Sequence, residues 1–452
     1  MNDLYLAFSY ETASGRFAGL LLGLAVVLWS FLSAPKYFHS TVPQKIFVLS
    51  VVVRFVLICL SVARIFNPPA SDLVWFEIDA ARIAMGVQPL VLSIASADNF
   101  EAFHAALFYV FGASFFLADM VGLAGYALSV IFLARFVRLL KLTEFEPLIL
   151  LPFCFLPGSL IFLNYNAREV FQVLFLILTM HGLVKYRQDN GILSLGMATL
   201  WGYLFAITHN RYIVVVPAII AIGLFLPKVT QARSATWQRI ALFPFAIGLL
   251  LIINFVSSGQ GFLSDVGDQG LINYVSDLSY RGGDLSARTQ FPFLLTSTDP
   301  ATFLLALPVM MAQFVLAPLI PFIIKAPVDI FPAIDTAVRL LYLYGTVRLI
   351  QNAKAPGALR DSALFLLTCY FLFCGISLLG TLNVGTQERH QLKIEWVLLL
   401  AGAPVIASIF SRRSGANWRR RLKTRRQVQP VFRIVRSESQ RPKAFSDERD
   451  SR

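Results

Sequence analysis

The chain has 452 residues, of which 57% are hydrophobic and 14% are charged, and its formal net charge at pH 7 is +13. Globular proteins carry about 25% charged residues, so this composition excludes an ordinary soluble domain. The apolar runs are too long for barrel strands, and in lipid only helices and closed barrels satisfy the backbone. We therefore predict an all-α, polytopic integral membrane protein whose membrane-embedded helical domain covers residues 1–410.

Apolar runs of about 18 residues or more predict the transmembrane spans, because such a run crosses the hydrocarbon core as a helix. The N-terminal residues are polar, and no signal-peptide cleavage site is evident. The four cysteines fall within predicted spans, where we expect reduced packing residues rather than disulfides or a metal site. Eleven spans are expected, near residues 17–34, 46–66, 116–138, 147–164, 169–186, 191–208, 211–227, 239–256, 331–350, 363–381 and 394–410.

The stretch 301–325 is long enough for a twelfth span, but Pro308, Pro318 and Pro321 interrupt it. Proline in a helix interior removes a hydrogen bond and kinks the chain. A twelfth span would also place the basic loop after residue 350 on the same side as the acidic loop that follows the second span. We therefore expect a broken, re-entrant or interfacial segment at 301–325.

The charges of the loops predict the orientation, because basic loops next to a membrane stay on its cytoplasmic side. Residues 411–452 carry 14 Lys and Arg against 4 Asp and Glu, whereas residues 67–104 carry five acids against Arg82. We expect an inner (plasma) membrane protein with its N-terminus outside and two larger extracytoplasmic loops, 67–104 and 257–300. The tail, 411–452, should be disordered or lie along anionic membrane lipids in the cytoplasm, and it requires no nucleic-acid partner.

The first outward loop contains a predicted helix that begins with an acidic turn. Ser71 has the character of an N-cap, and the following residues to Met85 show helical periodicity. Asp72 would lie at the start of this helix and Asp79 two turns later. A carboxylate there can act as a general base or bind a metal. The structural alternative, that Asp72 only interacts favourably with the helix dipole, has about even weight.

Arginines accumulate in loops that are predicted to face outward, although the positive-inside rule should deplete that side of them. Snorkelling explains any one arginine at a helix end, but it explains less well why four of them share a side. Several guanidiniums on one face favour a bound anion, and phosphate is the natural fit. The candidate binding residues are Arg168, His209, Arg211, Arg281, Arg389 and His390, with Glu169 opening the fifth span as a further acidic candidate.

These motifs resemble the membrane-embedded glycosyltransferases of the GT-C fold. The acidic Asp72, followed by Trp75, Phe76 and small residues up to Gly86, resembles their first extracytoplasmic loop. The segment 157–169 and the Arg389-His390 pair before a final apolar span are also similar to that family. The second loop followed by 301–325 resembles bacterial oligosaccharide repeat-unit polymerases. Two spans precede the acidic loop where one is usual in the GT-C fold, and this keeps the polymerase alternative open.

The resemblance implies transfer of a sugar from a polyprenyl-linked donor to a glycan or lipid-linked acceptor outside the membrane. It implies Asp72 as the catalytic base, with Asp79 and Glu169 as further candidates, and cations that stabilise the departing phosphate. The resemblance requires no cofactor, and the histidines do not have the spacing of zinc ligands. A divalent cation is an alternative that the sequence leaves open. A repeat-unit polymerase and a transporter or flippase of lipid-linked oligosaccharides are the alternatives. The few charges within spans and the lack of visible repeats argue mildly against transport.

Overall fold

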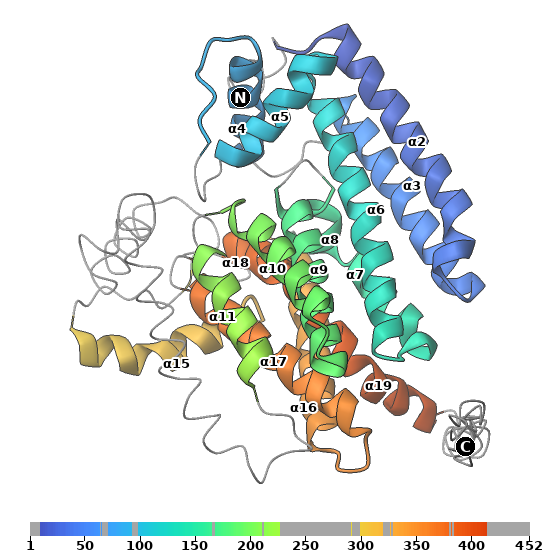
Figure 1. Cartoon of the computed structure of the whole chain (residues 1–452), viewed down its shortest axis with the longest axis vertical. Helices are drawn as coiled ribbons and strands as arrows, with labels where there is room; N and C mark the ends of the chain where they lie inside the picture. The colour runs from blue at the N-terminus through green and yellow to red at the C-terminus, as the bar shows by residue number, and fades with distance from the viewer. Residues whose placement is uncertain are drawn as a thin grey trace, which may run out of the picture. The chain divides into compact units, whose positions relative to one another are not determined.

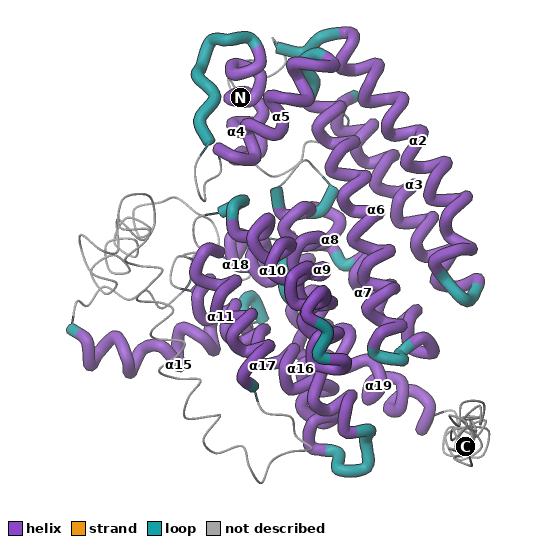
Figure 2. The backbone as a smooth tube through the Cα atoms, in the orientation of Figure 1, coloured by secondary structure: helices purple, strands orange, loops and turns teal. Residues whose placement is uncertain are grey.

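The structure is a computed structural model that describes residues 10–63, 65, 71–92, 98–164, 168–209, 212–226, 291, 299–319, 326, 329–378, 381 and 384–413. All regular elements in these ranges are helices, which confirms the predicted all-α class for the described part of the chain (Figure 2). Contacts divide the chain into one compact unit, Met1–Ala407, and a second, Ser408–Arg452. The fold described below is that of the first unit, and the predicted tail lies almost entirely outside the described residues.

Five described helices are long and apolar enough to cross a membrane: α2 (Ala13–Tyr37), α3 (Thr41–Val62), α6 (Phe115–Leu139), α9 (Glu169–Asp189) and α17 (Gly357–Leu378). A sixth candidate is the pair α18 (Val384–Leu392) and α19 (Trp396–Arg413), which is bent by 73°. The chain is therefore a helical protein with five to six candidate membrane spans in its described part.

The predicted count of eleven spans is not confirmed, and the differences have local causes. Residues 147–164 form two short helices, α7 (Glu146–Phe155) and α8 (Pro157–Phe162), in place of one span. The helices α10 (Ile192–Ala206) and α11 (Tyr212–Phe225) have 15 and 14 residues, shorter than a simple crossing requires. The predicted ninth span forms α16 (Ile330–Gln351), which carries ionisable residues. The predicted span 239–256 lies outside the described residues.

The segment expected to be broken, 301–325, begins as the helix α15 (Pro300–Leu316), which tolerates Pro308 in its interior. Asp299 caps the first turn by accepting hydrogen bonds from the backbone amide and the hydroxyl of Thr302. The helix ends at Leu316, before Pro318. The rest of the predicted segment, from residue 320 to residue 325, lies outside the described residues.

The helices α2, α3 and α6 pack side by side at the N-terminal end of the chain (Figure 1). Phe47, Val51 and Ile58 of α3 are fully buried against this group. On α2, Leu24, Leu28 and Leu32 repeat every four residues and are between 50% and 73% exposed. An apolar stripe of that kind on a candidate span is the face that lipid would cover.

Two helices of the predicted first outward loop, α4 (Ser71–Ala84) and α5 (Asp98–Phe111), pack against each other and against the N-terminal ends of α2 and α6. The helix predicted to follow Ser71 is confirmed, although Ser71 is its first helical residue rather than its N-cap and the helix ends at Ala84, one residue before Met85. Ala80 and Ala81 of α4 and Phe108 of α5 are buried together with Leu117 of α6. Figure 1 shows α5 leading directly into the N-terminal end of α6. This packing holds the acidic loop at one end of the bundle.

The break between α7 and α8 occurs at Leu156, whose ψ of 141° is extended, just before Pro157. Arg54 of α3 is fully buried and donates to the carbonyl oxygens of Cys154 at 3.1 Å and Ser159 at 2.9 Å. Its guanidinium also lies 3.8 Å from the ring centre of Tyr126. The carbonyl oxygen of Ser159 also accepts the backbone N–H of Leu163, whereas that of Cys154 lies at the broken end of α7. An unpaired carbonyl in an apolar bundle costs several kcal/mol, so the bond from Arg54 to Cys154 stabilises the break.

In the C-terminal half of this unit, α16 and α19 approach each other through two glycines. A Cβ atom added to Gly345 would lie 2.8 Å from the carbonyl oxygen of Gly402. Real Cβ atoms do not come that close to backbone atoms, so a side chain on Gly345 would force the helices apart. The close contact fixes the distance between α16, which carries residues of the buried polar network described below, and α19, which begins directly after Glu395 of that network.

We expect Gly345→Ala to destabilise the protein, by about 1–3 kcal/mol, because overpacking displaces backbone on both helices. The matched control is Gly196→Ala on the exposed face of α10, where an added Cβ meets nothing within 4 Å. This control should be neutral or stabilising by up to about 1 kcal/mol, because alanine favours helix more than glycine. Thermal unfolding of the purified protein in detergent would measure both, and equal melting temperatures would contradict the close-contact interpretation.

Candidate functional site

Four segments that the charge pattern assigned to the same side of the membrane meet in the structure. They are the α4–α5 pair, the N-terminal end of α9, the turn between α10 and α11, and α18. Asn99 of α5 donates to the carbonyl oxygen of Ile207 at 2.9 Å, which ties the acidic loop to the α10–α11 turn. Arg389 of α18 reaches Glu169 at the start of α9. Side chains that are up to about 300 residues apart in sequence therefore share one region.

Glu169 is the centre of a buried ionic cluster, which we call the Glu169 cluster (Glu169, Arg168, Arg389 and Lys393). Its Oε1 atom lies 3.0 Å from Nη2 of Arg389 and 3.6 Å from Nζ of Lys393. Arg168 immediately precedes it and adds a third positive charge. Glu169 and Lys393 are each 1% exposed, whereas the Arg389 side chain is 17% exposed. One buried carboxylate thus lies among three cationic side chains, two of which form ion pairs with it.

Aromatic and imidazole groups border this cluster. Lys393 donates a hydrogen bond to the hydroxyl oxygen of Tyr212 at 2.8 Å and lies 5.3 Å from the centre of the same ring. The ring of His209 lies 5.1 Å from that of Tyr212 and 6.5 Å from that of His390. The two histidines that the sequence singled out are therefore neighbours, although they come from different helix ends.

The acidic loop contacts the same region through Arg168, whose guanidinium carbon lies 4.9 Å from the ring centre of Phe76 on α4. Glu101 of α5 is half-buried here. Burial raises the pKa of Glu101 to about 7, with the negative charges of Asp79 and Asp98 acting in the same direction and Arg168 opposing them. The loop therefore contributes a carboxyl group that changes its charge close to neutral pH.

The structure brings together five of the predicted site residues: Arg168, Glu169, His209, Arg389 and His390. In the structure Glu169 is the counter-ion of two cations, a contact set that suits positioning better than proton abstraction. Asp79 forms an ion pair with Arg82 of its own helix at 3.6 Å, and both side chains are 30% exposed.

The remaining predicted site residues have no described side chain. Asp72 lies in the first turn of α4, where only the backbone is described. Arg211 and Arg281 lie outside the described residues. The roles predicted for these three residues stay predictions.

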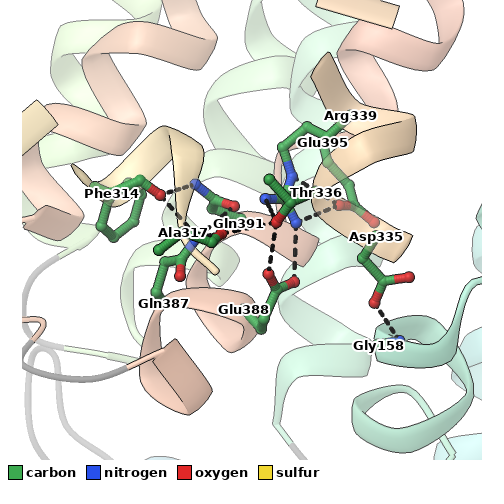
Figure 3. A network of polar contacts seen from close by, with 10 residues as sticks. All are labelled: Gly158, Phe314, Ala317, Asp335, Thr336, Arg339, Gln387, Glu388, Gln391 and Glu395. Carbon is green, nitrogen blue, oxygen red and sulfur yellow. Dashed lines mark hydrogen bonds and ion pairs between the residues drawn. The ribbon is translucent and has the colours of Figure 1, made fainter. Parts of the chain in front are cut away.

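A second buried ionic cluster was missed by the sequence analysis; we call it the Arg339 cluster (Asp335, Arg339, Glu388 and Glu395). Figure 3 shows its side chains converging from α16, α18 and the α18–α19 bend. Nη2 of Arg339 lies 2.9 Å from Oε2 of Glu388 and 3.3 Å from Oε2 of Glu395. Asp335, one turn earlier on α16, accepts the backbone N–H of Gly158 at 2.6 Å.

Two glutamines join this cluster to the end of α15 (Figure 3). The side-chain amides of Gln387 and Gln391 each donate to the carbonyl oxygen of Phe314 at 2.7 Å. Gln387 also donates to the carbonyl oxygen of Ala317 at 3.1 Å. These carbonyls belong to the last turn of α15 and its C-cap, which has no intrahelical donors. Polar side chains of α18 therefore bind it to three other helices, α9, α15 and α16.

The sequence contains a weak signal for the Arg339 cluster. Asp335 and Arg339 are four residues apart within a predicted span, and Glu388 and Glu395 are seven residues apart, spacings that place each pair on one helix face. The charges of Asp335 and Arg339 are among the few that lie within the predicted spans. Within the described ranges, no group of three or more His, Cys, Asp or Glu side chains is arranged to hold a metal ion.

Comparison with known proteins identifies no relative of this chain. No protein-family model matches it, and no significant match occurs among curated proteins or solved structures.

We expect Glu101→Gln to raise the melting temperature at about pH 8 by a few degrees and to leave it nearly unchanged at about pH 5. The raised pKa means that the native chain binds this proton more tightly than the unfolded chain does. The stabilisation from the protonated carboxyl is therefore lost as the pH rises through about 7. Thermal unfolding at both pH values measures the difference. Glu144→Gln, at an exposed carboxyl, is the control, and an equal response from both variants would contradict the assignment.

Proposed function

We propose that the protein is an integral membrane glycosyltransferase that transfers a sugar from a polyprenyl-linked donor to a glycan or lipid-linked acceptor. The observation that carries the proposal is the charge of the Glu169 cluster. Two guanidiniums and one ammonium gather around one buried carboxylate, and they supply several cationic donors for the oxygens of a phosphate or diphosphate group. Arginine and lysine are the side chains that bind phosphate oxygens most strongly.

The surroundings of the cluster fit a lipid-linked donor. The cluster lies at the ends of helices in an apolar bundle, so a polyprenyl chain can pack along helix faces while its phosphate reaches the cations. The charge pattern of the loops supports the outer side of the inner membrane for this region, with the N-terminus outside and the tail in the cytoplasm. Synthesis of a cell-surface polysaccharide or glycan is the corresponding role.

In the proposed reaction, the bond between the anomeric carbon of the donor sugar and its phosphate oxygen breaks, and the phosphate keeps the electron pair. Arg389, Lys393 and Arg168 stabilise the charge that develops on this leaving group. The acceptor hydroxyl forms the new glycosidic bond and gives its proton to a carboxylate of α4. Asp72 is the proposed base, with Asp79 as the second candidate, and His209 and His390 are proposed proton carriers.

A second candidate function is transport or flipping of a lipid-linked oligosaccharide, which the Arg339 cluster favours. Transporters place charged sites between interrupted helices near the middle of the membrane. Asp335 contacts the N-terminal end of α8, directly after the α7–α8 break, and Glu395 lies in the α18–α19 bend. Few charges lie within the predicted spans, which argued against transport. The buried positions of Asp335 and Glu395 beside interrupted helices now favour it. A repeat-unit polymerase would use the same donor chemistry as the transferase.

We expect polyprenyl monophosphate to raise the melting temperature of the purified protein, because a ligand stabilises the state that binds it. Arg389→Gln and Lys393→Met should each weaken this binding about tenfold or more, since a hydrogen bond to a charged group contributes about 1.5–3 kcal/mol. The control is Arg348→Gln, at an exposed arginine near the end of α16, which should bind as the wild type does.

Polyprenol without the phosphate separates headgroup binding from binding of the chain. The proposal requires that polyprenol produces a much smaller shift than polyprenyl monophosphate in the wild type. An equal shift from both lipids, or equal loss of binding in Arg389→Gln and Arg348→Gln, would contradict a phosphate site at this cluster. If Arg389→Gln does not fold, Arg168→Gln, at a half-buried arginine, provides the same comparison.

We expect Asp72→Asn to abolish surface glycan in a strain that lacks the chromosomal gene, and the lipid-linked donor to accumulate. An amide cannot accept the acceptor proton, although it keeps the shape of the side chain. Mass spectrometry of extracted lipids measures the accumulating species and separates the alternatives. A transferase defect leaves a sugar donor, whereas a polymerase or flippase defect leaves a completed repeat unit. Full complementation by normally inserted Asp72→Asn would remove Asp72 from the mechanism.

A further inference from the structure

The helix α18 separates two buried ionic clusters whose charges are unbalanced in opposite directions. Glu388 belongs to the Arg339 cluster, and Arg389, the next residue, belongs to the Glu169 cluster. The Glu169 cluster has three cations and one carboxylate. The Arg339 cluster has three carboxyl groups and one guanidinium, so it would carry an excess of two negative charges if every acid were ionised. Each of its four members is at most 5% exposed.

An excess of buried negative charge is costly, because removing an ion from water costs several kcal/mol unless a counter-charge or hydrogen bonds replace its hydration. Carboxyl groups avoid this cost by binding a proton. Arg339 satisfies Glu388 and Glu395 through its guanidinium. Among the described residues, Arg339 makes no hydrogen bond to Asp335, whose Oδ2 atom accepts the amide N–H of Gly158. The other oxygen, Oδ1 of Asp335, is buried and has no hydrogen-bond partner among the described residues.

The carboxyl groups of Asp335 and Glu388 both lie close to Gly158. A Cβ atom added to Gly158 would lie 2.6 Å from Oδ2 of Asp335 and 3.9 Å from Oε2 of Glu388. Glycine at this position allows both carboxyl groups to approach the N-terminal end of α8. Two carboxyl groups that share so small a region ionise together only at high cost, and one of them keeps a proton.

The hydrogen bonds of Thr336 also leave room for a proton on Glu388. A threonine hydroxyl has one hydrogen to donate and two lone pairs that accept. Oγ1 of Thr336 lies 2.8 Å from the carbonyl oxygen of Ala317 and 3.3 Å from Oε1 of Glu388, and it accepts from Nη1 of Arg339. When Thr336 donates to Ala317, its contact with Glu388 becomes a hydrogen bond only if Glu388 carries the proton. When Glu388 is ionised, the hydroxyl can turn towards it.

We propose that the Arg339 cluster is a proton-binding site in which Asp335 and Glu388 share one exchangeable proton. The step is the reversible addition of a proton from water to one carboxylate, and it requires no other reactant. The other titratable groups that face the site are Glu395, Arg339 and the buried hydroxyl of Tyr370 on α17. Two further cations lie nearby. Arg54 contacts Cys154 and Ser159 on either side of the α7–α8 break, and Arg389 follows Glu388 on α18. This proposal stands whether or not the protein is a transferase.

Infrared spectroscopy of the full chain in lipid nanodiscs tests the proposal, because a protonated carboxyl group has a carbonyl stretch that is separate from the carboxylate bands. At neutral pH we expect the wild type to show this band and Asp335→Asn and Glu388→Gln each to lose the intensity of one carboxyl group. Either variant leaves two carboxyl groups beside Arg339. This is the number that is ionised in the wild type when the third carries the proton, so the two remaining groups can both be ionised. The double variant should lose no more intensity than either single variant.

Glu169→Gln is the matched control, because Glu169 is equally buried but faces three cations and should be ionised. Its protonated-carboxyl band should equal that of the wild type. Titration of the wild-type band from about pH 5 to about pH 9 tests exchange directly and does not depend on whether any variant folds. A band of equal intensity in the wild type, Asp335→Asn and Glu388→Gln would overturn the proposal, and so would a wild-type band that does not change with pH.

Discussion

The position of α18 between two buried ionic clusters is the constraint on which the arrangement of the C-terminal helices depends. Consecutive residues of a helix point about 100° apart, so Glu388 and Arg389 cannot serve the same partner. Glu388 requires Arg339 of α16, and Arg389 requires Glu169 of α9. A rotation of α18 would leave several buried charges unpaired, at about 3–5 kcal/mol for each broken pair. The helix therefore has one orientation, which also directs Gln387 and Gln391 to the end of α15.

The interrupted helices are stable because charged side chains satisfy their ends. At the α7–α8 break, Arg54 donates to the carbonyl oxygen of Cys154 at the C-terminal end of α7, and Asp335 accepts from an amide at the N-terminal end of α8. These signs agree with the helix dipole, which is negative at a C-terminal end and positive at an N-terminal end. Arg54 and Asp335 are thus held by backbone rather than mainly by ions of opposite sign. Asp335 links this break to the Arg339 cluster, so the broken span and the charged helices form one connected polar core.

Several features of this core could be predicted from the sequence, and the reasons for the misses are physical. Composition predicted the helical class, helical periodicity predicted a helix up to Met85, and loop charge predicted that Glu169, Arg389, His209 and His390 share one side. Charge patterns assign a residue to a side of the membrane but give no depth, so they do not predict that Glu388 and Lys393 are buried. The partners of Arg54 are backbone carbonyls, which no residue pattern records. The break between α7, with 10 residues, and α8, with 6, was not predicted, because hydropathy does not detect a capped break.

The two clusters are connected through adjacent residues, and this has a thermodynamic consequence. Protonation of Glu388 weakens its pairing with Arg339, and binding of an anion to Arg389 competes with the pairing of Arg389 and Glu169. Both events act on the position of the same short helix. If each event favours a different position of α18, linkage requires that proton binding and anion binding change each other's affinity by the same factor. A proton site on one face of α18 and a phosphate site on the other would therefore be coupled without any direct contact between the proton and the phosphate.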